Sequence, residues 1–144
     1  MVALNNSLPP VTITPLRRIE HPKGDVFHGM KASDAGYAGF GEAYFTTIVA
    51  GETKGWKQHT EMTMNLIVPL GMVRFHIHNA DTGQTSSYDV GVNNYQRLTI
   101  PPGYWVAFQG LTTDTNLVLN IASLEHNPAE AVNVPLAIYP LVTP

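Results

Sequence analysis

The sequence predicts an all-β domain built from many short strands. Eleven prolines and twelve glycines divide the chain into short segments. Between them lie runs rich in Val, Ile, Thr, Tyr and Phe, the residues that strands favour. No segment shows a sustained 3.6-residue hydrophobic period, so we expect no long helix. Many short strands joined by tight turns are typical of β-barrels and β-sandwiches.

Nine segments have the composition of a strand, and 72–79 has the clearest pattern. Its apolar residues at 73, 75 and 77 share one face, while Arg74, His76 and His78 share the other. We expect these two histidines to be exposed or to face a partner, and the alternative is that they line a pocket. The nine expected strands are 11–14, 25–30, 41–49, 62–70, 72–79, 86–92, 96–100, 104–110 and 116–122.

The length and charge of the chain suggest one domain that associates with a second copy. A chain of 144 residues has the usual size of a single domain. We expect one domain over 1–144, with a loose arm over about 1–10 and a proline-rich tail over about 124–144 that lies over the strands. Charged residues make up 13% of the chain, against roughly 25% in typical soluble domains. This low charge and the detached arm predict a homodimer.

Several classes of function are disfavoured by composition. A net charge of −3 offers no basic field for nucleic acid. No window approaches the ~20 apolar residues of a membrane helix, and the N-terminus lacks the regions of a signal peptide, so we expect no membrane partner and a cytoplasmic location. The absence of cysteine excludes thiolate metal sites and a cysteine nucleophile.

Two stretches carry a recognisable pattern. Lys54-Gly-Trp-Lys-Gln-His59, followed by a segment that ends at Gly71, resembles the first motif of the cupins, and the segment 100–110 with its Pro-Pro-Gly resembles the second. With the turn at 21–27 and the strand at 40–45, they resemble dTDP-4-dehydrorhamnose 3,5-epimerases and dTDP-sugar 3,4-ketoisomerases. The resemblance covers about 16–126. It implies a cupin barrel, also called a double-stranded β-helix or jelly roll.

The resemblance also shows what has become of the usual cupin metal site. The four ligand positions of metal-binding cupins fall on Lys57, His59, Met64 and Val106. Only His59 is able to bind a transition metal, and the neighbouring lysine ammonium repels a cation. We therefore expect no bound metal and no other cofactor.

The resemblance implies chemistry on a nucleotide-linked 4-keto-6-deoxy sugar, with dTDP as the nucleotide. A ketone acidifies the neighbouring C–H, so a neutral imidazole is able to act as the base. His59 is the candidate base, and Lys57, on the same face of an extended segment, is the candidate for stabilising the enolate. Inversion at carbon also needs an opposing acid. The tyrosine that supplies it in the 3,5-epimerases is replaced by Asn120, and the late aspartate that holds their histidine falls in Asn133-Val134-Pro135, where no carboxylate stands.

The 3,4-ketoisomerases fit the spacing better, because their two motif histidines align with Lys57 and His59 without gaps. They also use a tyrosine from the preceding strand, for which Tyr44 is the candidate acid, on one face with Glu42. The further candidates for substrate binding are Glu42, Lys23, Asn65, Arg74, Asn120 and Trp105.

Two hypotheses stay open at this point. The first is a metal-independent epimerase or isomerase with His59 as its base. The second is a non-catalytic protein that binds a nucleotide sugar or another small ligand and has lost the catalytic tyrosine and aspartate.

Overall fold

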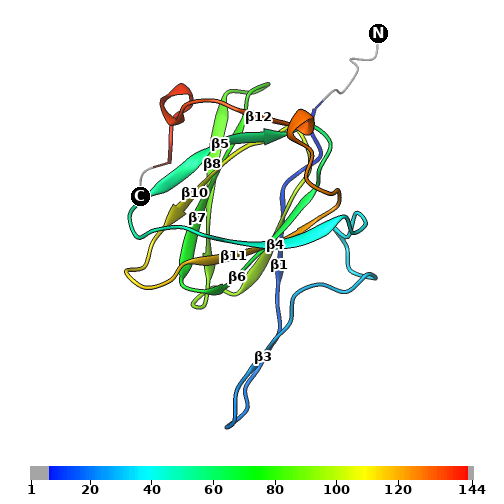
Figure 1. Cartoon of the computed structure of the whole chain (residues 1–144), viewed down its shortest axis with the longest axis vertical. Coiled ribbons are helices and arrows are strands. Elements are labelled where there is room, and N and C mark those ends of the chain that lie inside the picture. The colour runs from blue at the N-terminus through cyan, green and yellow to red at the C-terminus, as the bar shows by residue number, and fades with distance from the viewer. Residues whose placement is uncertain (1–6, 143–144) are drawn as a thin grey trace.

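The computed structural model describes residues 7–142 and consists almost entirely of antiparallel strands (Figure 1). Two five-stranded sheets face each other, as expected for paired β-sheets around one core. The first sheet has the order β1-β9-β6-β11-β4, and the second has the order β12-β5-β10-β7-β8. Their strands are β1 (Thr12–Pro15), β4 (Glu42–Thr47), β5 (Thr53–His59), β6 (Met64–Leu70), β7 (Met72–Asn79), β8 (Gln84–Gly91), β9 (Gln96–Ile100), β10 (Trp105–Gly110), β11 (Leu117–Ala122) and β12 (Ala131–Asn133).

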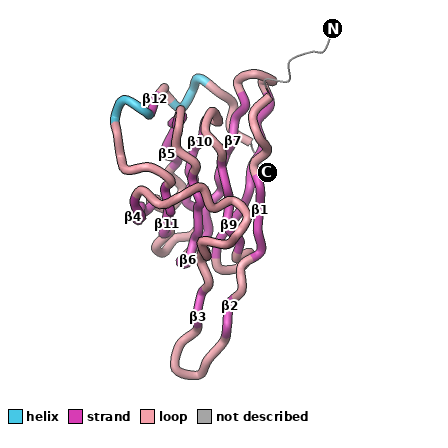
Figure 2. The backbone as a smooth tube through the Cα atoms, turned by 90° about the vertical axis from the view of Figure 1, so that its right-hand side faces the viewer, coloured by secondary structure: helices cyan, strands magenta, loops and turns pink. Residues whose placement is uncertain are grey.

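A third, two-stranded element projects from the body of the molecule. Strands β2 (Arg18–Ile19) and β3 (Val26–Phe27) form a hairpin that extends away from both sheets (Figure 2). Among residues 7–142 the helical elements are two short 3₁₀ turns, η1 (Pro128–Glu130) and η2 (Leu136–Ile138). No helix in this part of the chain is long and apolar enough to cross a membrane.

The inner faces of the two sheets supply the main core. The alternation expected in β7 is confirmed, since Val73, Phe75 and Ile77 are all buried in this core. Phe75 packs edge to face on Phe108 of β10, with ring centroids 4.9 Å apart, a favourable aromatic geometry. Leu66 of β6 meets them from the first sheet.

Each of the nine expected strands has a counterpart, although the one expected at 25–30 shrinks to β3. Three strands were not predicted: β2, β5 and β12. The segment of β5 contains glycine, two lysines and a single β-branched residue, so its intrinsic preference for strand is weak. It is extended because β10 pairs with one edge and β12 with the other. The tail thus contributes β12 to the second sheet, whereas the sequence predicted only that it lies over the strands.

The rest of the tail covers the outer face of the second sheet. Trp56, Trp105 and Ala107 form a second buried cluster there, under Tyr139 and other apolar tail residues. The ring of Tyr139 stacks on His78 with centroids 4.1 Å apart. Residues 1–6 of the expected N-terminal arm and 143–144 of the tail lie outside the described residues.

This cover corrects the expectation that His76 and His78 are exposed. Their side chains are 0% and 4% exposed. Nδ1 of His76 accepts a hydrogen bond from the backbone N–H of Val142 at 3.0 Å, and burial lowers the pKa of His78. Strand alternation separated the two faces of β7 correctly. It does not reveal that another segment covers the polar one.

We predict that Tyr139→Ala lowers the free energy of unfolding by about 2 kcal/mol, because it removes a half-buried ring that contacts Trp56, Trp105 and His78. Urea denaturation followed by tryptophan fluorescence measures the change. The neighbouring Ile138 is 56% exposed, so Ile138→Ala is the matched control and stays within about 0.5 kcal/mol of wild type. Equal stability of the two variants would show that the tail does not hold this face.

Candidate active site

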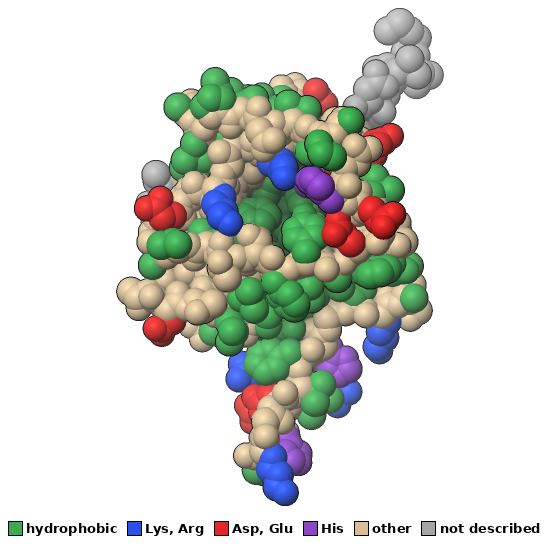
Figure 3. All heavy atoms as spheres, in the orientation of Figure 1, with side chains coloured by type: hydrophobic (Ala, Val, Ile, Leu, Met, Phe, Trp, Pro, Cys, Tyr) green, Lys and Arg blue, Asp and Glu red, His purple; other side chains and the backbone are tan. Residues whose placement is uncertain are grey.

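A pocket opens between the two sheets, where β4 of the first sheet faces β5 and β10 of the second. Its volume is about 220 Å³. Figure 3 shows this hollow in the middle of the visible face, with apolar side chains at its bottom and basic side chains near its rim. The volume is below the roughly 300–1,000 Å³ of pockets that enclose whole ligands, so the pocket suits one ring of a larger ligand. The lining residues are Tyr44, Thr46, Lys54, Gly55, Lys57, His59, Met64, Val106 and Phe108.

Strand β5 forms one wall of the pocket and lies unusually close to β10. A Cβ on Gly55 would come within 2.5 Å of the Cβ of Ala107, so only glycine permits this approach. Lys57 and His59 follow on the same strand. Because side chains two residues apart share a face of a strand, both line the pocket as predicted.

The most strongly fixed group in the pocket is His59. Its Nδ1 lies 2.7 Å from Oε1 of Glu130, and the two side chains are 5% and 3% exposed. Glu130 immediately precedes β12, whose first residue, Ala131, pairs with His59. The other carboxylate oxygen, Oε2, accepts hydrogen bonds from the backbone N–H groups of Glu61 and Met62. The pairing of β12 with β5 therefore brings a fully engaged carboxylate to the histidine.

These hydrogen bonds keep Glu130 ionised. Burial by itself would raise the pKa of Glu130, but the hydrogen bonds from His59, Glu61 and Met62, together with the charge interaction with His59, outweigh burial and hold the pKa below its ordinary value. An ionised carboxylate only accepts hydrogen bonds, so Nδ1 of His59 carries the proton in this contact. In the neutral form of the ring, the lone pair is therefore on Nε2, with which no described residue forms a hydrogen bond.

Glu130 corrects one inference from the sequence. The position of the epimerase aspartate was expected at 133–135, and the carboxylate was judged to be missing. In the structure the carboxylate at His59 belongs to Glu130, three residues before the segment 133–135. A signal was present in Asn127-Pro128, since the side chain of Asn127 caps the 3₁₀ turn that carries Glu130. The sequence offered no indication that this turn lies against His59, 71 positions away.

The four positions that hold metal in other cupins do meet in this pocket. Lys57, His59, Met64 and Val106 all line it. Among the described residues, no group of three or more His, Asp or Glu side chains is placed to hold a metal ion. The donor set at these positions is one imidazole beside an ammonium, which does not fit a transition metal. The ammonium of Lys57 forms no hydrogen bond or ion pair with any residue in 7–142.

The opposite wall holds Tyr44 on β4, so the structure brings together the three candidate catalytic residues Tyr44, Lys57 and His59. Asn120 of β11 lies directly behind Tyr44, and its Nδ2 donates to the phenol oxygen at 2.9 Å. Asn120 is 2% exposed and does not line the pocket. Its side chain contacts Tyr44, and direct contact with a substrate stays a prediction.

Three further candidates lie on the outer faces of the sheets. Asn65 packs under the loop that contains Gly36 and donates to that residue's carbonyl, Arg74 forms two hydrogen bonds with Asp89, and Trp105 is buried beneath Tyr139. Strand alternation already separates two of them from the pocket, because Asn65 adjoins Met64 and Trp105 adjoins Val106, which both face inward. None of the three lines this pocket, and their role in substrate binding stays a prediction.

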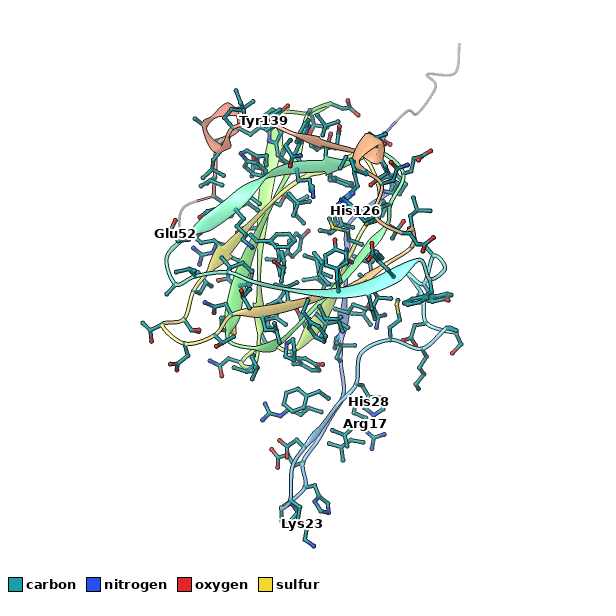
Figure 4. All side chains as sticks on the ribbon, in the orientation of Figure 1. Arg17, Lys23, His28, Glu52, His126 and Tyr139 are labelled. Atoms are coloured by element: carbon teal, nitrogen blue, oxygen red, sulfur yellow. The ribbon has the colours of Figure 1, made fainter. Side chains whose placement is uncertain are left out.

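The last two candidates, Glu42 and Lys23, are not among the lining residues either. Glu42, at the start of β4, accepts a hydrogen bond from the backbone N–H of His126. Lys23 lies at the far tip of the projecting hairpin (Figure 4). Sequence reasoning did not select Thr46 or Phe108, which line the pocket. Lys54, also in the lining, donates from Nζ to Oγ1 of Thr46 and to the carbonyl of Thr47.

Comparisons with known proteins identify similar structures. No protein-family model and no curated protein matches the sequence. A solved dTDP sugar isomerase from Desulfovibrio desulfuricans is 27% identical, with a TM-score of 0.85 over 89% of this chain and 85% of that one. A mutant of the 3,4-ketoisomerase QdtA from Thermoanaerobacterium thermosaccharolyticum, in complex with TDP-4-keto-6-deoxyglucose, is 19% identical, with a TM-score of 0.74 over 88% of each chain.

A third similar structure is the 3,5-epimerase RmlC from Legionella pneumophila in complex with dTDP-4-keto-L-rhamnose. It is 14% identical, with a TM-score of 0.76 over 92% of this chain and 79% of that one. The last two matches show a shared fold. The matching structures are dTDP-sugar isomerases and epimerases, which confirms the resemblance and the all-β, cupin-type assignment drawn from the sequence.

We predict that Glu130→Gln lowers the free energy of unfolding at pH 7 by about 2 kcal/mol. The substitution removes a buried carboxylate to which three N–H groups donate hydrogen bonds. The folded-state pKa of Glu130 is depressed, so this stabilisation is complete above the carboxyl's ordinary pKa and is lost as the pH falls through the folded-state pKa. Urea denaturation at pH 7 and at pH 3 measures the difference between wild type and variant. The difference should shrink at pH 3, and an unchanged difference would contradict the assignment of an ionised Glu130.

Proposed function

We propose that this chain is a metal-independent isomerase of a nucleotide-linked 4-keto-6-deoxy sugar, with dTDP as the nucleotide and His59 as the base. The observation that carries the proposal is the buried pair of His59 and Glu130, which leaves Nε2 available in a pocket shared with Lys57 and Tyr44. The similar solved structures are dTDP-sugar isomerases and epimerases, which supports this substrate class.

The proposed reaction begins with removal of the C3 proton by Nε2 of His59. The C4 ketone draws the released electron pair onto its oxygen, and the ammonium of Lys57 stabilises that oxygen. The imidazolium that forms is stabilised by the carboxylate of Glu130, as in other histidine and carboxylate pairs. Tyr44 protonates the C4 oxygen and recovers a proton from the C3 hydroxyl, while His59 returns its proton to C4. The ketone has then moved from C4 to C3 and no proton is gained or lost.

Ketoisomerisation suits this pocket better than epimerisation. Moving a proton between adjacent carbons on one face needs one base, whereas inversion needs a base and an acid on opposite faces. The position of the epimerase tyrosine is occupied by Asn120, which is buried behind Tyr44. We therefore propose 3,4-ketoisomerisation as the reaction. The alternative of a non-catalytic nucleotide-sugar binder remains as the negative outcome of the following test.

We predict that in heavy water the protein introduces deuterium next to the ketone of a dTDP-4-keto-6-deoxy sugar, measured by mass spectrometry. His59→Ala should slow this exchange at least ~100-fold, because it removes a positioned general base. Tyr44→Phe should retain exchange and lose net isomerisation, since it removes only the proton donor to oxygen. His28→Ala, at the base of the hairpin, is the control and should exchange at the wild-type rate. If deuterium never enters, or enters equally fast with His59→Ala, the protein is a binder and not this enzyme.

We also propose that the protein is a homodimer. The low content of charged residues is one reason. In addition, Phe40, which precedes β4, and Phe45, within β4, are 63% and 64% exposed, which is unusual for aromatic side chains on a free surface. Light scattering at micromolar concentration should give about twice the chain mass of 15.7 kDa. A mass equal to that of one chain would contradict the proposal.

A further inference from the structure

Asn120 lies at the centre of a short chain of hydrogen bonds between the backbone of β6 and the pocket. Its Oδ1 accepts from the backbone N–H of Asn65 at 3.2 Å, and its Nδ2 donates to the phenol oxygen of Tyr44 at 2.9 Å. The side chain is 2% exposed, so water does not compete for either contact. Asn120 pairs with Tyr44 across β11 and β4 and with Leu66 across β11 and β6, so neighbouring strands hold it on both sides.

The direction of these hydrogen bonds follows from the chemistry of the groups. A backbone N–H only donates, so the amide atom that faces Asn65 is the oxygen. The atom that faces Tyr44 is then the NH₂ group, which has no lone pair to offer. Tyr44 must accept in this contact, and its own proton must point elsewhere. No described residue is recorded as an acceptor for that proton, and Tyr44 lines the pocket.

We propose that Asn120 is a positioning residue that makes Tyr44 a hydrogen-bond donor toward the sugar oxygen in the pocket. This inference rests on the proposed function, since the donor is useful only if a carbonyl or hydroxyl oxygen is bound there. It assigns a role to the residue that replaces the epimerase tyrosine. Asn120 does not itself supply a proton. Instead, it orients Tyr44, the proposed acid on the adjacent strand β4.

A purely structural role for Asn120 is the alternative, because its Nδ2 also contacts Sδ of Met62 at 3.8 Å and its side chain fills buried space. The two roles predict opposite orders for two substitutions. Asn120→Asp keeps the shape and the acceptor for Asn65, but it presents an oxygen to Tyr44. That oxygen only accepts, so it draws the phenol proton away from the pocket. Asn120→Ala leaves a cavity, but it leaves the phenol free to rotate and donate.

The experiment measures kcat/KM for ketoisomerisation of the dTDP-4-keto-6-deoxy sugar in both variants, and the rate of deuterium exchange in the same two variants combined with Tyr44→Phe. Asn120→Asp should lose roughly 100-fold, comparable with the loss of one donor to a developing oxyanion, and Asn120→Ala less than about 10-fold. With Tyr44→Phe the two substitutions should have equal effects on the exchange rate, since no phenol proton remains to orient. Thermal unfolding of every variant confirms that it is folded.

Binding measured by calorimetry makes the test independent of turnover. Asn120→Asp should weaken binding of the keto sugar nucleotide and leave binding of dTDP alone unchanged. If the wild type binds the keto sugar without turnover and Asn120→Asp weakens that binding, the proposed reaction fails and the role of Asn120 stands. If turnover is present but Asn120→Ala is as damaging as Asn120→Asp, or the Asp variant matches wild type, the inference is wrong and the proposed function is unaffected. If the wild type does not bind the keto sugar, both are wrong.

Discussion

The hydrogen bond between His59 and Glu130 is the interaction on which the rest of the site depends. Burying an ionised carboxylate is costly unless its oxygens are satisfied, and here His59 and two backbone N–H groups satisfy them. The contact requires β12 to pair with β5, and that pairing makes β5 an interior strand of its sheet. This hydrogen bond therefore links the tautomer of the histidine, the position of the tail and the wall of the pocket.

The C-terminal tail contacts both faces of the second sheet. At its start, Glu130 contacts a residue of the inner, pocket face. Further along, Tyr139 and Val142 cover His78 and His76 on the outer face. Trp56 lies between these regions, and it exchanges two backbone hydrogen bonds with Val134. Because the tail packs on β5 from both sides, displacement of its outer part would also disturb the strand that carries Lys57 and His59.

The pocket combines the imidazole of His59, the phenol of Tyr44 and the ammonium of Lys57, which has no partner among residues 7–142, with largely apolar surroundings. A weakly polar environment strengthens each of these electrostatic contacts relative to water. No second imidazole or carboxylate stands opposite His59 among the lining residues, which is why the proposed reaction transfers the proton on a single face. The resemblance had suggested that the catalytic tyrosine and aspartate were both lost. The structure places other groups, Tyr44 and Glu130, in contact with the same pocket and the same histidine.

The sequence by itself determined the class of fold, most strands, and the shared face of Lys57 and His59, because strand alternation is local and has a period of two. The tertiary structure decided which strands have partners, and hence that β5 and β12 are strands at all. It also decided that Glu130 meets His59, that Asn120 donates a hydrogen bond to Tyr44, and that His76 and His78 are buried. These outcomes depend on contacts between residues about 60 to 80 positions apart in the chain. Local patterns carry no information about such contacts, since they describe a strand's two faces and not what covers each one.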